Sequence, residues 1–447
     1  MARLLFGTDG IRGLAGIYPL DSKTAHAVGA ALGKLVVKSG QERQVVIGMD
    51  TRESGSWLAA EVAGGLARHS VTSDFAGVTT TPGVAYLART GPFAAGVMIS
   101  ASHNPYRDNG IKLIAHTGYK LPDQQEEQLE AEIFALLDSI APSPATLQVD
   151  EDLDHTYIDH LAGTLVGGPG GLRIVVDCAN GSASFLAPEL FERLGAAVRR
   201  INCSPDGRNI NLNSGSLYLD GLRKIVLEES ADVGVAFDGD ADRALFVSRS
   251  GRIVDGDAVL LLTARYLKGQ RRLPGQLVVA TVMSNLGLER ALTAQGIRML
   301  RTPVGDKYVL EEMLRTGAML GGEQSGHVIF HEYATTGDGM LTALRVFEVM
   351  RQAGTGLDEL IADLKVYPQL LVNVRVRERK PLEDLPNVKA EIRAAEASFG
   401  DAGRVLVRFS GTEPLARVMV EGPDQERVEN FANRIASQIR AELGGEM

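Results

Sequence analysis

The chain has 447 residues, of which 45% are hydrophobic and 23% charged, so it is long enough for three or four domains of ordinary globular composition. Its formal net charge of −10 argues against a nucleic-acid or membrane partner, and any site for an anionic ligand must create its positive field locally. Only two cysteines occur and no apolar run reaches signal-peptide or transmembrane length, which indicates a reducing, cytoplasmic setting.

A glycine-rich segment over residues 6–13, FGTDGIRG, comes first and contains Arg12. A guanidinium in such a tight loop suits bidentate capture of a phosphate, although a solvated turn is the simpler alternative. Helical spacing follows over residues 22–39, and an apolar run predicts a buried strand over 44–49.

A second buried strand is predicted over residues 96–100, before the polar loop 101–105 with Ser102 and His103. Residues 108–110, Asp-Asn-Gly, predict another tight turn, after which an apolar run contains Lys112. A serine presented at a strand end beside an imidazole and an amine suggests a nucleophile in a phosphate-sized nest. An ordinary strand–turn–strand is the alternative.

Apolar strands followed by a polar turn and a helix recur, with strands starting near residues 45, 174 and 278. This faint repeat predicts related α/β units, which bind ligands at their strand ends. A further strand over 233–237 leads into Asp238, Asp240 and Asp242. Three alternating carboxylates can converge on one cation, and oxygen-only ligands favour Mg²⁺. An EF-hand is excluded because its sixth position is Arg243.

Two later loops offer groups that could bind a sugar phosphate. Residues 321–327, GGEQSGH, place Glu323, Ser325 and His327 between glycines, where they could read sugar hydroxyls, although His327 could equally be structural. Residues 408–417 combine two cations, two hydroxyls and a glycine in a plausible phosphate cradle between two strands, or else an ordinary hairpin; they are Arg408, Ser410, Gly411, Thr412 and Arg417.

After Tyr367-Pro368 the β-α-β-β-α order of the predicted elements lacks the repeat and indicates a separate small α+β domain. The four loops together predict phosphoryl transfer on a phosphosugar. They supply a nucleophilic serine, three carboxylates for a metal ion, groups that could bind sugar hydroxyls and groups that could bind a phosphate.

The chain resembles the α-D-phosphohexomutases over its whole length, and its motifs occur in the family's order. The segments that carry the resemblance are TDGIRG at 8–13, SASHNP at 100–105, DGDADR at 238–243, GEQSGH at 322–327 and RFSGTEP at 408–414. The resemblance implies three related α/β mixed-sheet domains and a smaller C-terminal α+β domain around a central cleft, with predicted bounds 1–155, 156–254, 255–366 and 367–447.

The resemblance further implies an isomerase that interconverts glucosamine 6-phosphate and glucosamine 1-phosphate for UDP-N-acetylglucosamine and cell-wall precursor synthesis. Ser102, carried as phosphoserine, would donate its phosphoryl group, with glucosamine 1,6-bisphosphate as intermediate and activator. Mg²⁺ would be held by Asp238, Asp240, Asp242 and the Ser102 phosphate, while Arg12, Lys112 and His103 support the transfer. Because arginine is a poor base, Arg12 needs a strongly perturbed site or acts mainly electrostatically.

The same resemblance assigns the sugar hydroxyls to Glu323 and Ser325 with His327 nearby, and the unreacting phosphate to the loop from Arg408 to Arg417. It implies a small-molecule partner and a monomer or homodimer. Three alternatives remain: phosphoglucose or phosphomannose specificity within the family, a phosphatase that loses the phosphoryl group to water, and a sugar-phosphate-binding protein without catalysis.

Overall fold

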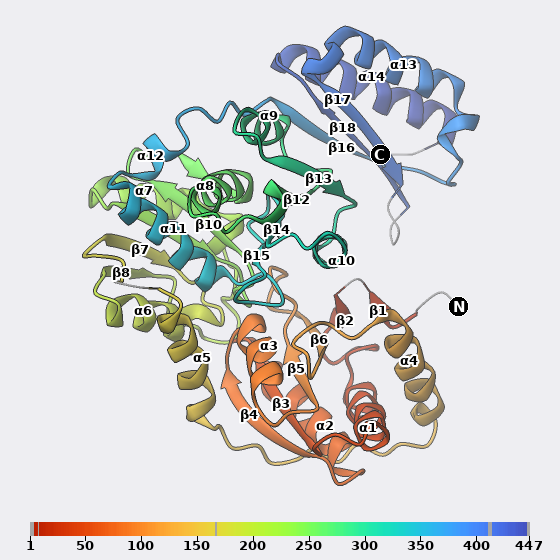
Figure 1. Cartoon of the computed structure of the whole chain (residues 1–447). Coiled ribbons are helices and arrows are strands. Elements are labelled where there is room, and N and C mark those ends of the chain that lie inside the picture. Colours follow the sequence, from red (N-terminus) through yellow and green to blue (C-terminus); the bar gives the residue numbers. More distant parts are fainter. Residues whose placement is uncertain (1–3, 8, 166–167, 410–413, 445–447) are drawn as a thin grey trace. The chain divides into compact units, whose positions relative to one another are not determined.

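The computed structural model describes residues 4–7, 9–165, 168–409 and 414–444, and they form two compact units (Figure 1). The larger unit takes the described residues up to Met283 and the segment Ile297–Ala362. The smaller unit takes Ser284–Gly296 and the described residues from Asp363 onward.

The first sheet of the larger unit has six strands in the order β1-β2-β6-β5-β3-β4. They are β1 (Phe6–Gly7), β2 (Gly10–Leu14), β3 (Gln44–Met49), β4 (Thr72–Val78), β5 (Ala95–Ile99) and β6 (Asp108–Ala115). Strand β3 is parallel to β4 and β5, whereas β5, β6 and β2 are antiparallel neighbours. Side chains alternate across β3: Val45 and Ile47 belong to one apolar core and Val46 to another, so both faces are covered.

Helices cover the two faces of this sheet. Helices α1 (Ser22–Ser39), α2 (Gly55–Ala67) and α4 (Asp123–Leu137) contribute to one core, and α3 (Thr81–Thr90) contributes to the other. Helix α5 (Glu151–Gly163) packs against α3 and β4.

The prediction of a tight turn at Asp108–Gly110 is wrong. These residues begin strand β6, where Asp108, Asn109 and Gly110 pair with Leu14, Gly13 and Arg12 of β2. Pairing with a strand about a hundred residues away overrides the local turn preference of an Asp-Asn-Gly sequence.

The second sheet has five strands in the order β11-β10-β9-β7-β8. They are β7 (Arg173–Asp177), β8 (Ala197–Ile201), β9 (Val233–Phe237), β10 (Ala244–Ser248) and β11 (Ile253–Val254). Helix α7 (Asp220–Glu228) packs its Leu222 and Val226 on one face. Helix α6 (Ala183–Arg193) and the short helix η1 (Gly215–Leu217) complete the region.

The third sheet has four strands in the order β13-β12-β14-β15. They are β12 (Leu277–Thr281), β13 (Arg298–Thr302), β14 (Leu320–Gly322) and β15 (Val328–Phe330). Its helices are α8 (Gly256–Gly269), α10 (Asp306–Thr316), α11 (Gly339–Ala353) and α12 (Leu357–Leu360), with the short helix η2 (Pro274–Gln276) before β12.

The three sheets share one plan. Strands β3, β7 and β12 each lie between two parallel partners, and the strands β5, β9 and β14 each pair antiparallel with the next strand along the chain. The predicted repeat of α/β mixed-sheet units is confirmed.

The smaller unit is an antiparallel sheet, ordered β16-β18-β17, packed with helices. It consists of β16 (Gln369–Arg375), η3 (Leu382–Asp384), α13 (Pro386–Phe399), η4 (Gly400–Ala402), β17 (Arg404–Phe409), β18 (Leu415–Glu421), α14 (Gln425–Leu443) and, from earlier in the chain, α9 (Leu286–Ala294). The backbone N–H of Leu286 donates to the fully buried Glu421 at 2.8 Å, which ties α9 to β18. The predicted β-α-β-β-α order is confirmed.

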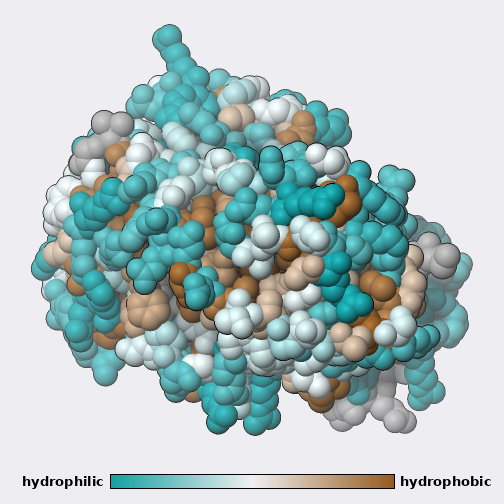
Figure 2. All heavy atoms as spheres, turned by 90° about the horizontal axis from the view of Figure 1, so that it is seen from below, coloured by the Kyte–Doolittle hydropathy of each residue, from teal (hydrophilic) through white to brown (hydrophobic). Residues whose placement is uncertain are grey.

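Hydrophilic residues cover most of the face shown in Figure 2, with hydrophobic residues in smaller patches between them. Of the helices in the described ranges, none is both long and apolar enough to cross a membrane.

Candidate active site

Ser102 follows the end of β5 in a loop that turns it toward the second sheet. Its backbone has a φ of +51°, in the left-handed region that non-glycine residues rarely adopt. The buried Ser102 hydroxyl donates to Asp238 Oδ2 at 2.6 Å and lies 3.2 Å from His103 Nδ1. The structure therefore brings together a hydroxyl and a carboxylate that are 136 positions apart.

The three aspartates of the turn after β9 face one another. Oxygens of Asp238, Asp240 and Asp242 lie within 4.8 Å of one another, and all three residues are buried. Asp240 Oδ1 and Asp242 Oδ1 have no hydrogen-bond partner among the described residues. Arg243 Nε lies 3.7 Å from Asp242 Oδ1, beyond hydrogen-bond distance. Buried carboxylate oxygens without a hydrogen bond are costly unless a cation satisfies them, so this donor set fits a divalent metal ion. Residues 238–242 are called the metal turn below.

Electrostatics within the trio supports the same conclusion. Burial, and then the charges of Asp242 and Asp240, raise the pKa of Asp238 well above its usual value. Burial and Asp240 also raise the pKa of Asp242. Burial would raise the pKa of Asp240 too, but the ammonium of Lys112 outweighs it and lowers that pKa. Without a cation, Asp238 and Asp242 therefore hold a proton to higher pH than a free aspartate does, and a bound metal ion would oppose this protonation.

The competition between protons and a metal ion for these aspartates predicts how the free energy of unfolding depends on pH. Asp238 has a raised pKa in the folded state and about 3.9 when unfolded, so its stabilising effect is complete below that unfolded value and is lost as the pH rises. We expect the free energy of unfolding in chelator to fall, relative to that in saturating MgCl₂, as the pH rises above about 4. Urea unfolding in both conditions measures this difference; parallel pH profiles would contradict the prediction.

Lys112 lies between the metal turn and the N-terminal loop. Its Nζ is 2.8 Å from Asp240 Oδ2 and 3.0 Å from Asp9 Oδ2. Burial alone would lower the pKa of Lys112, but Asp240 and Asp9 raise it. Asp9 also pairs with Arg12. Lys112 is therefore a fixed cation beside the serine and not a free base.

A third cation extends this network to the third sheet. Lys120 Nζ lies 2.5 Å from Asp9 Oδ1 and 2.5 Å from Asp306 Oδ2. Sequence analysis placed Asp9 in the glycine-rich segment but gave it no role, and it missed Lys120, because the charge of Lys120 does not differ in sequence from an ordinary solvated one.

His103 is neutral in this setting. Burial, followed by the charges of Arg243 and Arg12, lowers its pKa to about 4. Its ring can therefore exchange a hydrogen bond with the serine hydroxyl at neutral pH without adding charge to the site.

The loop between β14 and β15 carries the predicted sugar-reading residues. The backbone N–H of Gly305 donates to Glu323 Oε1 at 3.1 Å. The Ser325 hydroxyl and both ring nitrogens of the buried His327 have no hydrogen-bond partner among the described residues. Gly326 O accepts from Ala244 N at 3.1 Å, which joins this loop to the strand after the metal turn. The site thus contains unused polar groups beside the cation cluster.

The predicted phosphate grip belongs to the smaller unit. Arg408 and Arg417 are cross-strand partners of β17 and β18, and burial together with Arg417 lowers the pKa of Arg408. Like charges directly opposite each other on neighbouring strands are unfavourable. Ser410, Gly411 and Thr412 lie outside the described residues.

Four models of one protein family match successive segments of the chain. Models of the phosphoglucomutase/phosphomannomutase alpha/beta/alpha domains I, II and III match residues 3–138, 155–251 and 255–367, and the model of the C-terminal domain matches residues 371–438.

Two curated relatives span the chain almost completely. Phosphoglucosamine mutase from Solibacter usitatus is 63% identical, with 99% of this chain and 100% of the relative covered. The phosphoglucosamine mutase of Koribacter versatilis is 51% identical, with 99% and 98% covered. A solved phosphoglucomutase/phosphomannomutase family protein from Burkholderia thailandensis shares the fold, with a TM-score of 0.82 at 24% identity and 99% and 98% of the two chains covered.

Proposed function

This chain belongs to the α-D-phosphohexomutase family, and we propose that it interconverts glucosamine 6-phosphate and glucosamine 1-phosphate. The observation that carries the proposal is the 2.6 Å contact between the Ser102 hydroxyl and Asp238 of the buried carboxylate trio. The names of the two curated relatives described above favour the amino sugar over glucose and mannose.

In this proposal Ser102 carries the phosphoryl group. The bond from phosphorus to Ser102 Oγ breaks, a bond from phosphorus to a sugar hydroxyl oxygen forms, and the proton of that hydroxyl ends on Ser102 Oγ. The resulting glucosamine 1,6-bisphosphate then reorients. Ser102 Oγ bonds to the other phosphorus, the bond from that phosphorus to the sugar oxygen breaks, and the serine proton passes to the sugar oxygen. Asp238, Asp240 and Asp242 would hold Mg²⁺, which supplies charge neutralisation to the phosphoryl oxygens.

In this proposal two cations of the chain, Lys112 and Arg12, also stabilise the negative charge of the transferring phosphoryl group. Lys112 is held as an ammonium by Asp240 and Asp9, and Arg12 is oriented by Asp9. Both act on the transferring group through charge, and neither is arranged as a free base. His103, neutral at physiological pH, supports the serine oxygen through its Nδ1.

Substrate binding is assigned to groups that still have hydrogen-bonding capacity. We assign the sugar hydroxyls to Glu323, Ser325 and His327, the last two of which have unpartnered polar atoms in the described structure. The phosphate that does not react is assigned to the cradle of the smaller unit, which comprises Arg408, Ser410, Gly411, Thr412 and Arg417. We also propose the four domains predicted from the sequence, the last of which begins at residue 367.

Substrate comparison tests the function. Values of kcat/KM measured on glucosamine, glucose and mannose 6-phosphates are expected to favour glucosamine by at least about 10-fold. A preference for either neutral sugar would replace the proposed specificity with that of a phosphoglucomutase or phosphomannomutase. Release of inorganic phosphate as fast as isomerisation would indicate a phosphatase.

A further inference from the structure

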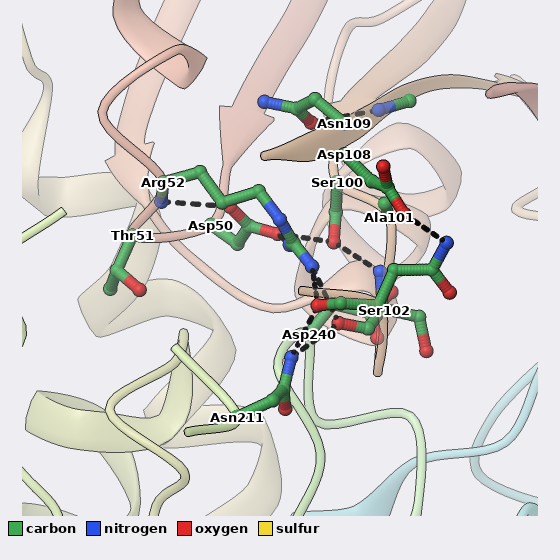
Figure 3. A network of polar contacts seen from close by, with 12 residues as sticks. Asp50, Thr51, Arg52, Ser100, Ala101, Ser102, Asp108, Asn109, Asn211 and Asp240 are labelled. Atoms are coloured by element: carbon green, nitrogen blue, oxygen red, sulfur yellow. Dashed lines mark hydrogen bonds and ion pairs between the residues drawn. The ribbon is translucent and has the colours of Figure 1, made fainter. Parts of the chain in front are cut away.

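The loop that carries Ser102 is held through its backbone by two donors from distant segments (Figure 3). Arg52 Nη2 donates to the carbonyl oxygens of Ser102 at 3.0 Å and of Asn104 at 2.6 Å. Asn211 Nδ2 donates to the same two oxygens, at 2.9 Å and 3.1 Å. Each carbonyl therefore receives one charged and one neutral donor, and both flank His103.

Arg52 is anchored within the first sheet. Its side chain is fully buried and pairs with the equally buried Asp50. Asp50 Oδ2 accepts from the Ser100 hydroxyl at 2.5 Å, and Ser100 Oγ accepts from the Ser102 N–H at 2.9 Å. One donor of the pair is thus rigid with the strand that presents Ser102.

Asn211 reaches the loop from the second sheet. It lies between β8 and η1 with a left-handed φ of +60°, and its N–H donates to the carbonyl of Ala179 at 2.8 Å. Gly239 of the metal turn packs against the same point: a Cβ there would lie 2.4 Å from the Ser102 carbonyl oxygen and 2.9 Å from Asn211 Nδ2. Asn211 therefore contacts the serine loop where the metal turn also touches it.

We propose that Asn211, with Arg52, is a positioning residue that keeps the Ser102 oxygen aimed at the carboxylate trio in both the phosphorylated and the free state. The inference rests on the proposed phosphomutase function. Each transfer adds or removes nearly two negative charges at Ser102, while a left-handed backbone is intrinsically unfavourable for serine. A clamp on the carbonyls resists relaxation of this backbone, and small displacements of a reacting atom strongly reduce rate.

Asn211→Gly and Asn211→Asp test this role. Glycine tolerates the left-handed backbone but removes the donor, and aspartate keeps the shape but presents acceptors to the two carbonyls. Asn213→Gly is the matched control, because Asn213 also has a left-handed φ of +50° but is exposed. Arg52→Lys keeps the charge beside Asp50 while removing the planar fork.

We expect kcat per phosphorylated Ser102 to fall by about 10- to 100-fold in both Asn211 variants and in Arg52→Lys, with KM changed by less than about 3-fold. Inorganic phosphate released per isomerisation is expected to rise, because a loosened phosphoserine admits water. Asn213→Gly should leave each of these quantities at the wild-type value.

Two distinguishable results would overturn the proposal, and only the first of them leaves the proposed function intact. If the variants lose thermal stability but keep wild-type kcat per phosphorylated serine, Asn211 is only a structural residue and the positioning role is wrong. If wild-type protein isomerises none of the three hexose phosphates, the proposed function itself fails, and the inference fails with it.

Discussion

Replacing Ser102 with alanine or glycine is expected to lower kcat for isomerisation by at least about 10³-fold, because the carrier of the phosphoryl group is removed. The two variants separate chemistry from conformation. Glycine accepts the left-handed backbone observed at this position, whereas alanine does not accept it readily. Both should also fail to take up phosphate from glucosamine 1,6-bisphosphate, which intact mass measures directly.

Retention of isomerisation in Ser102→Gly would contradict phosphoryl transfer through this serine. If Ser102→Ala lost activity while Ser102→Gly kept it, the loss would be due to the backbone conformation and not to the missing hydroxyl. Thermal unfolding of both variants in saturating MgCl₂ controls for loss of the folded state.

Asp242→Asn is expected to have the second large effect, which is to weaken the binding of Mg²⁺. Its Oδ1 has no hydrogen-bond partner among the described residues, and Arg243 and Lys112 lie 3.7 and 3.9 Å from its carboxylate oxygens. The substitution therefore removes the charge of a proposed metal ligand without breaking a short ion pair. The Mg²⁺ concentration for half-maximal activity is expected to rise by at least about 10- to 100-fold, since even outer-shell changes have effects of that size. An Mg²⁺ titration of activity, with a calorimetric titration of the protein alone, measures the shift.

The same variant should be more stable than wild type in chelator, because one of three mutually repelling buried carboxylates is gone. Asp220→Asn, in the exposed first turn of α7, is the control for the Mg²⁺ requirement, which it should leave unchanged. An unchanged Mg²⁺ requirement in Asp242→Asn would contradict the assignment of this trio to the metal.

The main architecture could be predicted from the sequence because it depends on local patterns. Apolar runs such as 44–49, ending in polar turns, predict buried strands whose ends hold functional groups, and β3, β7 and β12 fit that pattern. The predicted β-α-β-β-α order after residue 368 likewise ends in α14, whose Val428, Phe431 and Ile435 are buried. Alternation alone predicted that Asp238, Asp240 and Asp242 converge.

What could not be predicted depends on contacts between distant segments. Residues 50–55 appear in sequence as a polar turn, yet Arg52 is fully buried and Asn211 meets Ser102 across 109 positions. Asp9 and Lys120 form an ion pair that is invisible without the fold. Each of these side chains takes its role from the burial and neighbours that tertiary packing supplies, and propensity carries no information about them.

A rapid-quench experiment tests the central claim most directly. Enzyme carrying labelled phosphate on Ser102 is mixed with glucosamine 6-phosphate, and the label is followed on the protein, in sugar phosphates and as inorganic phosphate. The account predicts that label leaves Ser102 and enters the sugar at least as fast as kcat. Label that leaves Ser102 more slowly than kcat, or that appears only as inorganic phosphate, would contradict it.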